Sequence, residues 1–109
     1  MILKPVKWLG DSLERIREFA DEPRRETGYQ LERVQAGKDA KDWKPMPTVG
    51  LGVNEIRVSA ASGAFRLIYV ARFVEAVYVL HAFQKKARKT AKSDIDLARR
   101  RFRALVQER

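Results

Sequence analysis

The alternation of hydrophobic and polar residues predicts three consecutive strands between residues 54 and 83. In the first, residues 54–60, Ile56 and Val58 lie on one face, and the other face is polar: Glu55, Arg57 and Ser59. The second and third strands, residues 65–70 and 76–83, are rich in β-branched and aromatic side chains. Short links at 61–63 and 73–75 suit hairpin turns, so the three strands are expected to form an antiparallel meander.

The third strand runs without a turn signal into a cluster of basic residues. Strict alternation assigns one face to Val77, Val79, His81, Phe83 and Lys85. It assigns the opposite face to Tyr78, Leu80, Ala82, Gln84 and Lys86.

Helical periodicity predicts two short helices before the strands. The first begins at Asp11, an N-cap residue that Glu14 would complete as a capping box, and its apolar stripe is Leu13, Ile16, Phe19 and Ala20. The second extends from about Pro23 to Ala36, with an inner face of Thr27, Leu31 and Val34. Two helices joined by so few residues are expected to form an antiparallel hairpin.

The remaining segments complete the fold. Residues 2–9 could form a short strand, which Pro5 would confine to a sheet edge or to an irregular start because proline lacks an N–H. Residues 37–53 predict a long loop that is either functional or, the favoured interpretation, held by Trp43 and Met46. A last helix would begin near Thr90 or Ser93 and dock through a stripe of apolar residues: Ile95, Ala98, Phe102, Leu105 and Val106. The prediction is a single α+β domain over residues 1–109, in which an N-terminal helical hairpin packs on a small antiparallel sheet with a C-terminal helix.

Composition narrows the classes of function. The chain has no cysteine and one histidine, which argues against a thiolate or zinc site, and no glycine-rich phosphate loop joins a strand to a helix. We therefore expect neither a metal nor another cofactor. No apolar run is long enough to span a membrane and the N-terminus lacks the pattern of a secretion signal, so a cytoplasmic protein is expected.

The net charge of +9 is unevenly distributed. Residues 82–109 hold ten Lys and Arg against three Asp and Glu, a net charge of +7, whereas residues 1–81 hold 13 against 11. This asymmetry favours a local surface for a polyanion such as RNA or DNA. A solvated basic helix is the alternative interpretation.

Polar residues on the strands are the candidates for chemistry. Glu55, Arg57 and Arg66 could bind a ligand or could form a cross-strand ion pair. His81 could act on a substrate or be a hydrogen-bonded core histidine. RNA carries its own nucleophile, the 2′-OH, so cleavage requires proton transfer and fixed cations that stabilise the phosphorane. Such a reaction needs no metal ion.

Three short motifs in this order resemble the phage-derived HigB-like toxins of the RelE/ParE superfamily. They are Asn54-Glu55-Ile56-Arg57-Val58, Phe65-Arg66-Leu67-Ile68-Tyr69, and Leu80-His81-Ala82-Phe83-Gln84-Lys85-Lys86 followed by Lys89-Thr90. The resemblance covers residues 50–105 well. It implies a type II toxin that cuts mRNA in the ribosomal A site and is neutralised by a helix-turn-helix antitoxin encoded by a neighbouring gene.

The resemblance also assigns roles to individual residues. It implies catalytic roles at a phosphate site for Arg57, Arg66, Lys85 and Lys86. Substrate binding would fall to Arg88, Lys89, Lys92, His81 and Glu55. The chain departs from RelE-type members because it has no tyrosine after Tyr78 to stack on a base. A ParE-type inhibitor of DNA gyrase and a simple RNA-binding module are the alternatives.

Overall fold

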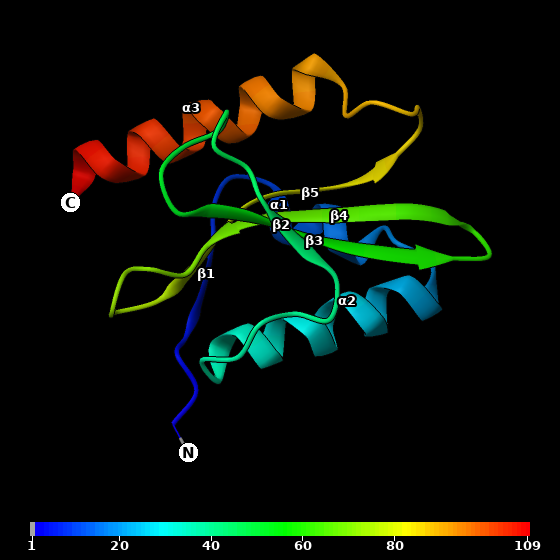
Figure 1. Cartoon of the computed structure of the whole chain (residues 1–109), viewed down its shortest axis with the longest axis horizontal. Coiled ribbons are helices and arrows are strands. Elements are labelled where there is room, and N and C mark those ends of the chain that lie inside the picture. Colours follow the sequence, from blue (N-terminus) through cyan, green and yellow to red (C-terminus); the bar gives the residue numbers. More distant parts are fainter. Residues whose placement is uncertain (1) are drawn as a thin grey trace.

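Helices cover both faces of one five-stranded sheet, so the molecule has three layers (Figure 1). The structure is a computed structural model that describes residues 2–109. The strands are β1 (Val6–Trp8), β2 (Trp43–Pro45), β3 (Val53–Ala60), β4 (Gly63–Val70) and β5 (Val77–Lys85). The helices are α1 (Ser12–Arg17), α2 (Asp21–Gln35) and α3 (Lys92–Glu108). The predicted α+β class is confirmed.

The sheet is mixed rather than antiparallel, which corrects the prediction. Its order is β1-β5-β4-β3-β2, and the meander β3-β4-β5 is antiparallel as expected. The N-terminal strand β1 lies beside β5 and runs in the same direction, with Val6 opposite Val77. Pro5 precedes this edge strand, and its carbonyl accepts a hydrogen bond from the N–H of Val77.

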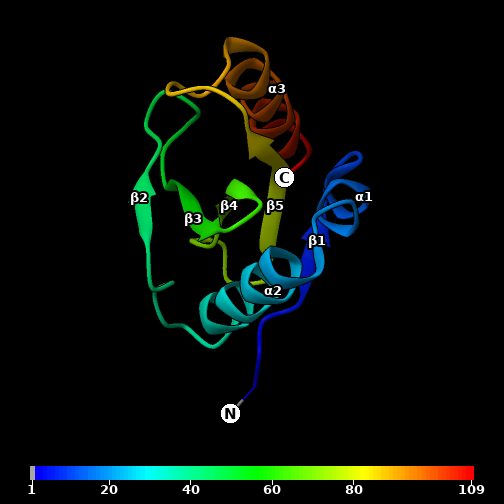
Figure 2. The same cartoon turned by 90° about the vertical axis from the view of Figure 1, so that its right-hand side faces the viewer.

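The two N-terminal helices do not form the predicted hairpin. They lie on the same face of the sheet but on different strands, α1 against β5 and α2 against β3 (Figure 2). The predicted capping box is also absent, because the carboxylate of Asp11 makes no capping bond and is bound by Arg15 and Arg101 instead. The predicted inner face of α2 is confirmed, since Thr27, Leu31 and Val34 are buried.

Each face of the sheet has its own hydrophobic core. The core under α1 and α2 contains Phe19, Leu31, Ile56, Phe65, Leu67 and Val79, among others. The core under α3 contains Val53, Ile68, Leu80, Phe83, Ala98, Phe102 and Leu105, among others. The predicted stripe of α3 is therefore largely confirmed, although Val106 is exposed.

A β-bulge in β5 corrects the predicted faces of that strand. Tyr69 pairs with Val79 and Ile68 pairs with His81, so Leu80 is an extra residue between the two pairs. The extra residue reverses the alternation: Val77 and Val79 belong to the α1–α2 side, whereas Leu80, His81 and Phe83 lie on the α3 side. Strict alternation predicts that Val77 and Val79 share a face with His81, and this prediction is wrong.

The segment from 37 to 53 is more ordered than predicted. It contains β2, which pairs with β3 at the far edge of the sheet. Met46 is buried as expected, but Trp43, the other predicted anchor, is exposed. Ala40 and Val49 are also buried and help to hold this segment. Helix α3 begins at Lys92 with Ala91 as its N-cap, and no side-chain capping bond is made.

Candidate nucleic-acid interface

The polar residues of β3 and β4 lie on the face of the sheet that also carries α3. Glu55 is only 1% exposed, and its Oε1 lies 3.7 Å from Nε of Arg66 on the neighbouring strand. Nη1 of Arg66 donates to the carbonyl of Phe65. The cross-strand ion pair, one of the two interpretations of these residues, is therefore present, and it fixes the direction of the Arg66 guanidinium.

Arg57 lies directly opposite Arg66 in the register of β3 and β4. Two like charges in this position repel each other, and each guanidinium is paired with a different carboxylate, Arg66 with Glu55 and Arg57 with Asp42. Nε and Nη2 of Arg57 both donate to Oδ1 of Asp42, at 3.0 and 2.9 Å. The Arg57 guanidinium is thus held at the β2 edge of the sheet, away from the Glu55–Arg66 pair.

Lys85 ends β5 and lies on the α3 side, whereas Lys86 follows the strand and projects to the other face. Nζ of Lys86 donates to Oε1 of Gln84, which pairs with Phe65 of the core under α1 and α2. Lys85 is a diagonal neighbour of Arg66, since Arg66 pairs with Phe83 and Ala64 pairs with Lys85. Lys86 borders a separate cavity of about 320 Å³ together with Arg15 of α1, Glu18 directly after α1, and Asp94 of α3. The two lysines do not converge on one point in this structure.

A cavity of about 610 Å³ lies between β2, the end of β5 and the start of α3. Four cationic side chains line it: Lys44, Lys85, Arg88 and Lys89. Among the described residues, no Asp or Glu lines this cavity. The concentration of positive charge in a concave surface attracts and retains an anionic ligand. We call these four residues the cationic cleft.

His81 is buried next to this region. Its Nε2 lies 2.7 Å from Oδ1 of Asp94 in the first turn of α3, and its ring stacks on Phe83 with a centroid separation of 5.1 Å. Burial lowers the pKa of His81 below its usual value, although the hydrogen bond to Asp94 acts in the opposite direction. The neutral ring therefore ties α3 to β5, which agrees with the core-histidine interpretation.

The structure brings together part of the predicted site. Lys85, Arg88 and Lys89 line the cationic cleft, and Arg66 lies on the same face as Lys85 without lining the cleft. Lys92 is almost fully exposed at the start of α3 and lies 3.9 Å from Asp96. Sequence reasoning missed Lys44, Asp42 and Asp94. Lys44 and Asp42 lie in or next to β2, a strand the sequence did not reveal, and Asp94 depends on the bulge at Leu80.

Across residues 2–109, no three His, Cys, Asp or Glu side chains are grouped in a way that could hold a metal ion. Within the same residues, no helix is both long enough and apolar enough to cross a membrane.

Comparison with known proteins gives one family match. Residues 14–103 match the family described as Phage derived protein Gp49-like (DUF891). The match spans β3, β4, β5 and most of α3, and so includes the Glu55–Arg66 pair and the cationic cleft. No curated protein matches the chain at a significant level.

Proposed function

Because the chain belongs to the phage-derived Gp49-like family, which is part of the RelE/HigB-type toxin group, we propose that it is an mRNA-cleaving toxin. In this proposal it is the toxin of a type II toxin–antitoxin system that cuts mRNA on the ribosome. It acts in the cytoplasm and is neutralised by a helix-turn-helix antitoxin encoded by a neighbouring gene.

The observation that carries this proposal is the cationic cleft beside Arg66. Four cations with no lining carboxylate among residues 2–109 suit a phosphodiester backbone. Cleavage by the 2′-OH builds negative charge on the phosphorane, and cations already fixed in place stabilise that charge without reorganisation. Arg66 is fixed by Glu55 and Phe65, and Lys85 projects from the adjacent strand. These two residues are proposed to bind the scissile phosphate.

The other predicted site residues take different places in this proposal. Arg88, Lys89 and Lys44 would hold the flanking phosphates or ribosomal RNA. Arg57 would have to release Asp42 before it could reach a phosphate, so we assign it a supporting role. Glu55 would position Arg66, and His81 would hold α3 in place rather than contact the RNA, because both its nitrogens are buried in the described structure.

Adjacent lysines on opposite faces provide a matched test. Each variant would be expressed from an inducible promoter, and the 5′ ends of cellular mRNA would be mapped by primer extension. Lys85→Ala should reduce cleavage by about 10²-fold, the usual cost of losing one group that stabilises the transition-state charge. Arg103→Ala removes an exposed cation of α3 outside the cleft and should cut as the wild type does.

Lys86→Ala decides between the two faces of the sheet. Normal cleavage by Lys86→Ala together with loss in Lys85→Ala places the reaction on the α3 side, and the reverse result places it beside α1. Growth arrest with intact mRNA and DNA damage would instead support a gyrase inhibitor. Purified protein that binds RNA without any cleavage on the ribosome would support a simple binding module.

A further inference from the structure

One edge of β3 is left uncovered. β2 begins at Trp43, which pairs with Ile56. Beyond that pair, the N–H of Arg57 donates to the carbonyl of Asp42, the residue before β2. No strand within residues 2–109 covers the stretch of β3 that follows Arg57. Backbone groups of successive residues point to alternate sides of a strand, so Ser59 directs its N–H and C=O to the same side as Arg57 does. These groups are a template for another strand.

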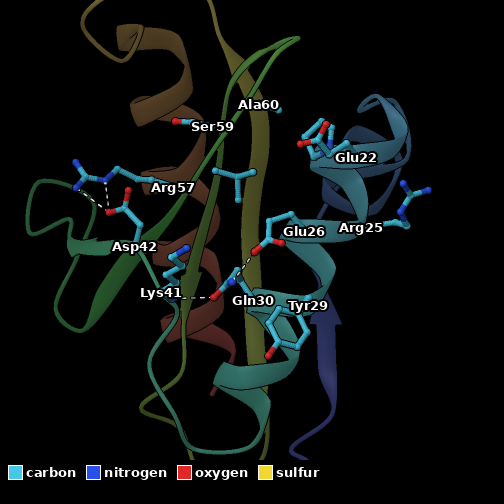
Figure 3. A pocket seen from close by; sticks show the side chains of 12 residues that line it. Glu22, Arg25, Glu26, Tyr29, Gln30, Lys41, Asp42, Arg57, Ser59 and Ala60 are labelled. Carbon is cyan, nitrogen blue, oxygen red and sulfur yellow. Dashed lines mark hydrogen bonds and ion pairs between the residues drawn. The ribbon is translucent and has the colours of Figure 1, made fainter.

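A cavity of about 630 Å³ lies along this edge, between β3 and helix α2 (Figure 3). Its β3 wall is formed by residues 57–60, and its α2 wall presents Glu22, Arg25, Glu26 and Tyr29. Tyr29 is 56% exposed although it is a large aromatic side chain. An exposed tyrosine beside an open strand edge is suited to a protein contact, because its ring adds apolar contact area at a low entropy cost.

The charge of this groove differs from that of the cationic cleft. Three acidic residues and three basic residues line it: Glu22, Glu26 and Asp42, and Arg25, Lys41 and Arg57. The whole of residues 11–42, which includes α1 and α2, holds nine acidic and seven basic residues, whereas residues 43–109 hold five and fourteen. A polyanion is therefore drawn to the other side of the molecule. A polypeptide backbone matches both the neutral lining and the free N–H and C=O groups of the edge.

We propose that this groove binds an extended segment of the antitoxin, which adds as a β-strand to the open edge of β3 and packs against Tyr29. Strand addition supplies affinity through main-chain hydrogen bonds, and the side chains that enter the groove supply specificity. This inference rests on the proposed function for the identity of the partner. Its groove is distinct from the cationic cleft, so binding there leaves the cleft accessible unless another part of the antitoxin covers it.

Ser59→Pro tests the strand addition directly. Proline removes the N–H that faces the open edge, and no ladder bond between β3 and β4 depends on that N–H. Ser59→Ala is the matched control because it keeps the N–H. The probe is the purified product of the neighbouring gene, and its Kd is measured by calorimetry against each full-length variant. Ser59→Pro should raise the Kd at least tenfold, and Ser59→Ala should leave it unchanged.

A second variant tests the groove without changing the backbone of β3, in case Ser59→Pro does not fold. Tyr29→Ala leaves the backbone of β3 intact and should also raise the Kd at least tenfold, whereas Leu51→Ala, which truncates an exposed apolar residue elsewhere, should not. Hydrogen–deuterium exchange should show new protection of residues 57–60 in the wild-type complex. Unchanged affinity in both Ser59→Pro and Tyr29→Ala, or the absence of any binding by the wild type, overturns the inference.

Separate readouts distinguish this inference from the proposed function. Growth arrest and mRNA cleavage without antitoxin report on the nuclease, and both should persist in Ser59→Pro and Tyr29→Ala. Loss of antitoxin binding in a chain that never cuts mRNA would support the groove and refute the nuclease. A wild-type dimer that dissociates in Ser59→Pro would show that a second copy of the chain occupies the edge. Protection of residues 57–60 by RNA would show that a nucleic acid binds there. Either result overturns the inference.

Discussion

Glu55 and His81 are the titratable side chains buried most completely within the sheet. Both lie on the α3 side, and each has one polar atom with no partner within residues 2–109, Oε2 of Glu55 and Nδ1 of His81. A buried polar atom without a partner costs free energy, so each residue must be compensated by its other contacts. Those contacts are Arg66 for Glu55 and Asp94 for His81.

Removal of Arg66 should leave a buried, uncompensated carboxylate. Arg66→Ala is therefore expected to destabilise the fold by about 3 kcal/mol, the usual cost of breaking one side of a buried ion pair. The double variant Glu55→Gln/Arg66→Ala should recover most of that loss, because the buried charge is gone. Urea denaturation measures both values.

Activity separates the two roles of Arg66. The double variant should remain unable to cleave mRNA even though its stability returns, since the phosphate-binding cation is still missing. Restored cleavage in the double variant would mean that Arg66 serves only the fold.

His81 should make stability depend on pH. Burial lowers the pKa of His81 in the folded state, so the unfolded chain binds its proton more readily. The stabilisation is complete above the unfolded pKa of about 6.5, and it is lost as the pH falls from that value through the lower pKa of the folded state. His81→Gln keeps a hydrogen-bond donor for Asp94 but does not titrate. Thermal melts from pH 7.5 to 5.5 should show a smaller decrease in Tm for His81→Gln than for the wild type.

At the scale of elements, α3 is held to the sheet by a close backbone approach. A Cβ on Gly50 would lie 2.2 Å from the ring of Phe102, so the loop after β2 can pass over α3 only without a side chain there. Arg101 adds a polar link, because it donates to the carbonyl of Leu80, the extra residue of the bulge, and to Asp11 before α1. The same helix carries Asp94, so its position also determines the surroundings of the cationic cleft.

Two glycines give opposite expectations for the same substitution. Gly50→Ala should destabilise the protein by about 1–3 kcal/mol, because the added methyl group overpacks the contact with Phe102. Gly28→Ala should stabilise it by up to about 1 kcal/mol, since no described atom lies within 4 Å of a Cβ there and alanine favours the interior of α2. Urea denaturation of both variants checks the pair, and a stable Gly50→Ala would show that α3 can move.

At the scale of the whole molecule, charge is divided between the two sides of the sheet. The α3 side carries the cationic cleft, and the α2 side carries the neutral groove beside β3. If the proposed function and the proposed strand addition both hold, this division gives the RNA and the antitoxin separate surfaces on one small domain.

RNA affinity should therefore depend strongly on salt. Four cleft cations on a single strand predict a slope of about −3 for log K against log salt concentration, at about 0.7 per phosphate contact. Lys44→Ala should reduce the magnitude of the slope by about 0.7, whereas Arg103→Ala should not change it. Fluorescence anisotropy with a labelled RNA over a salt series measures the slope. A slope near zero would exclude the cleft as the RNA surface.

The sequence alone determined the elements that depend on local pattern. Alternation from Ile56 onward predicted the meander, and periodicity predicted the buried faces of α2 and α3, because neighbours in sequence specify these features. The uneven charge predicted a basic surface. The motifs around Glu55, Arg66 and His81 predicted the toxin group that the family match supports.

Tertiary structure decided what depends on distant partners. β1 pairs in parallel with β5, a strand that is far from it in the sequence. β2 is a strand only because it pairs with β3. The bulge at Leu80 reverses one strand face and brings His81 to Asp94, which no local alternation could reveal. Lys85 and Lys86 are adjacent in sequence but lie on opposite faces, and only the assembled sheet and α3 give each its own surroundings.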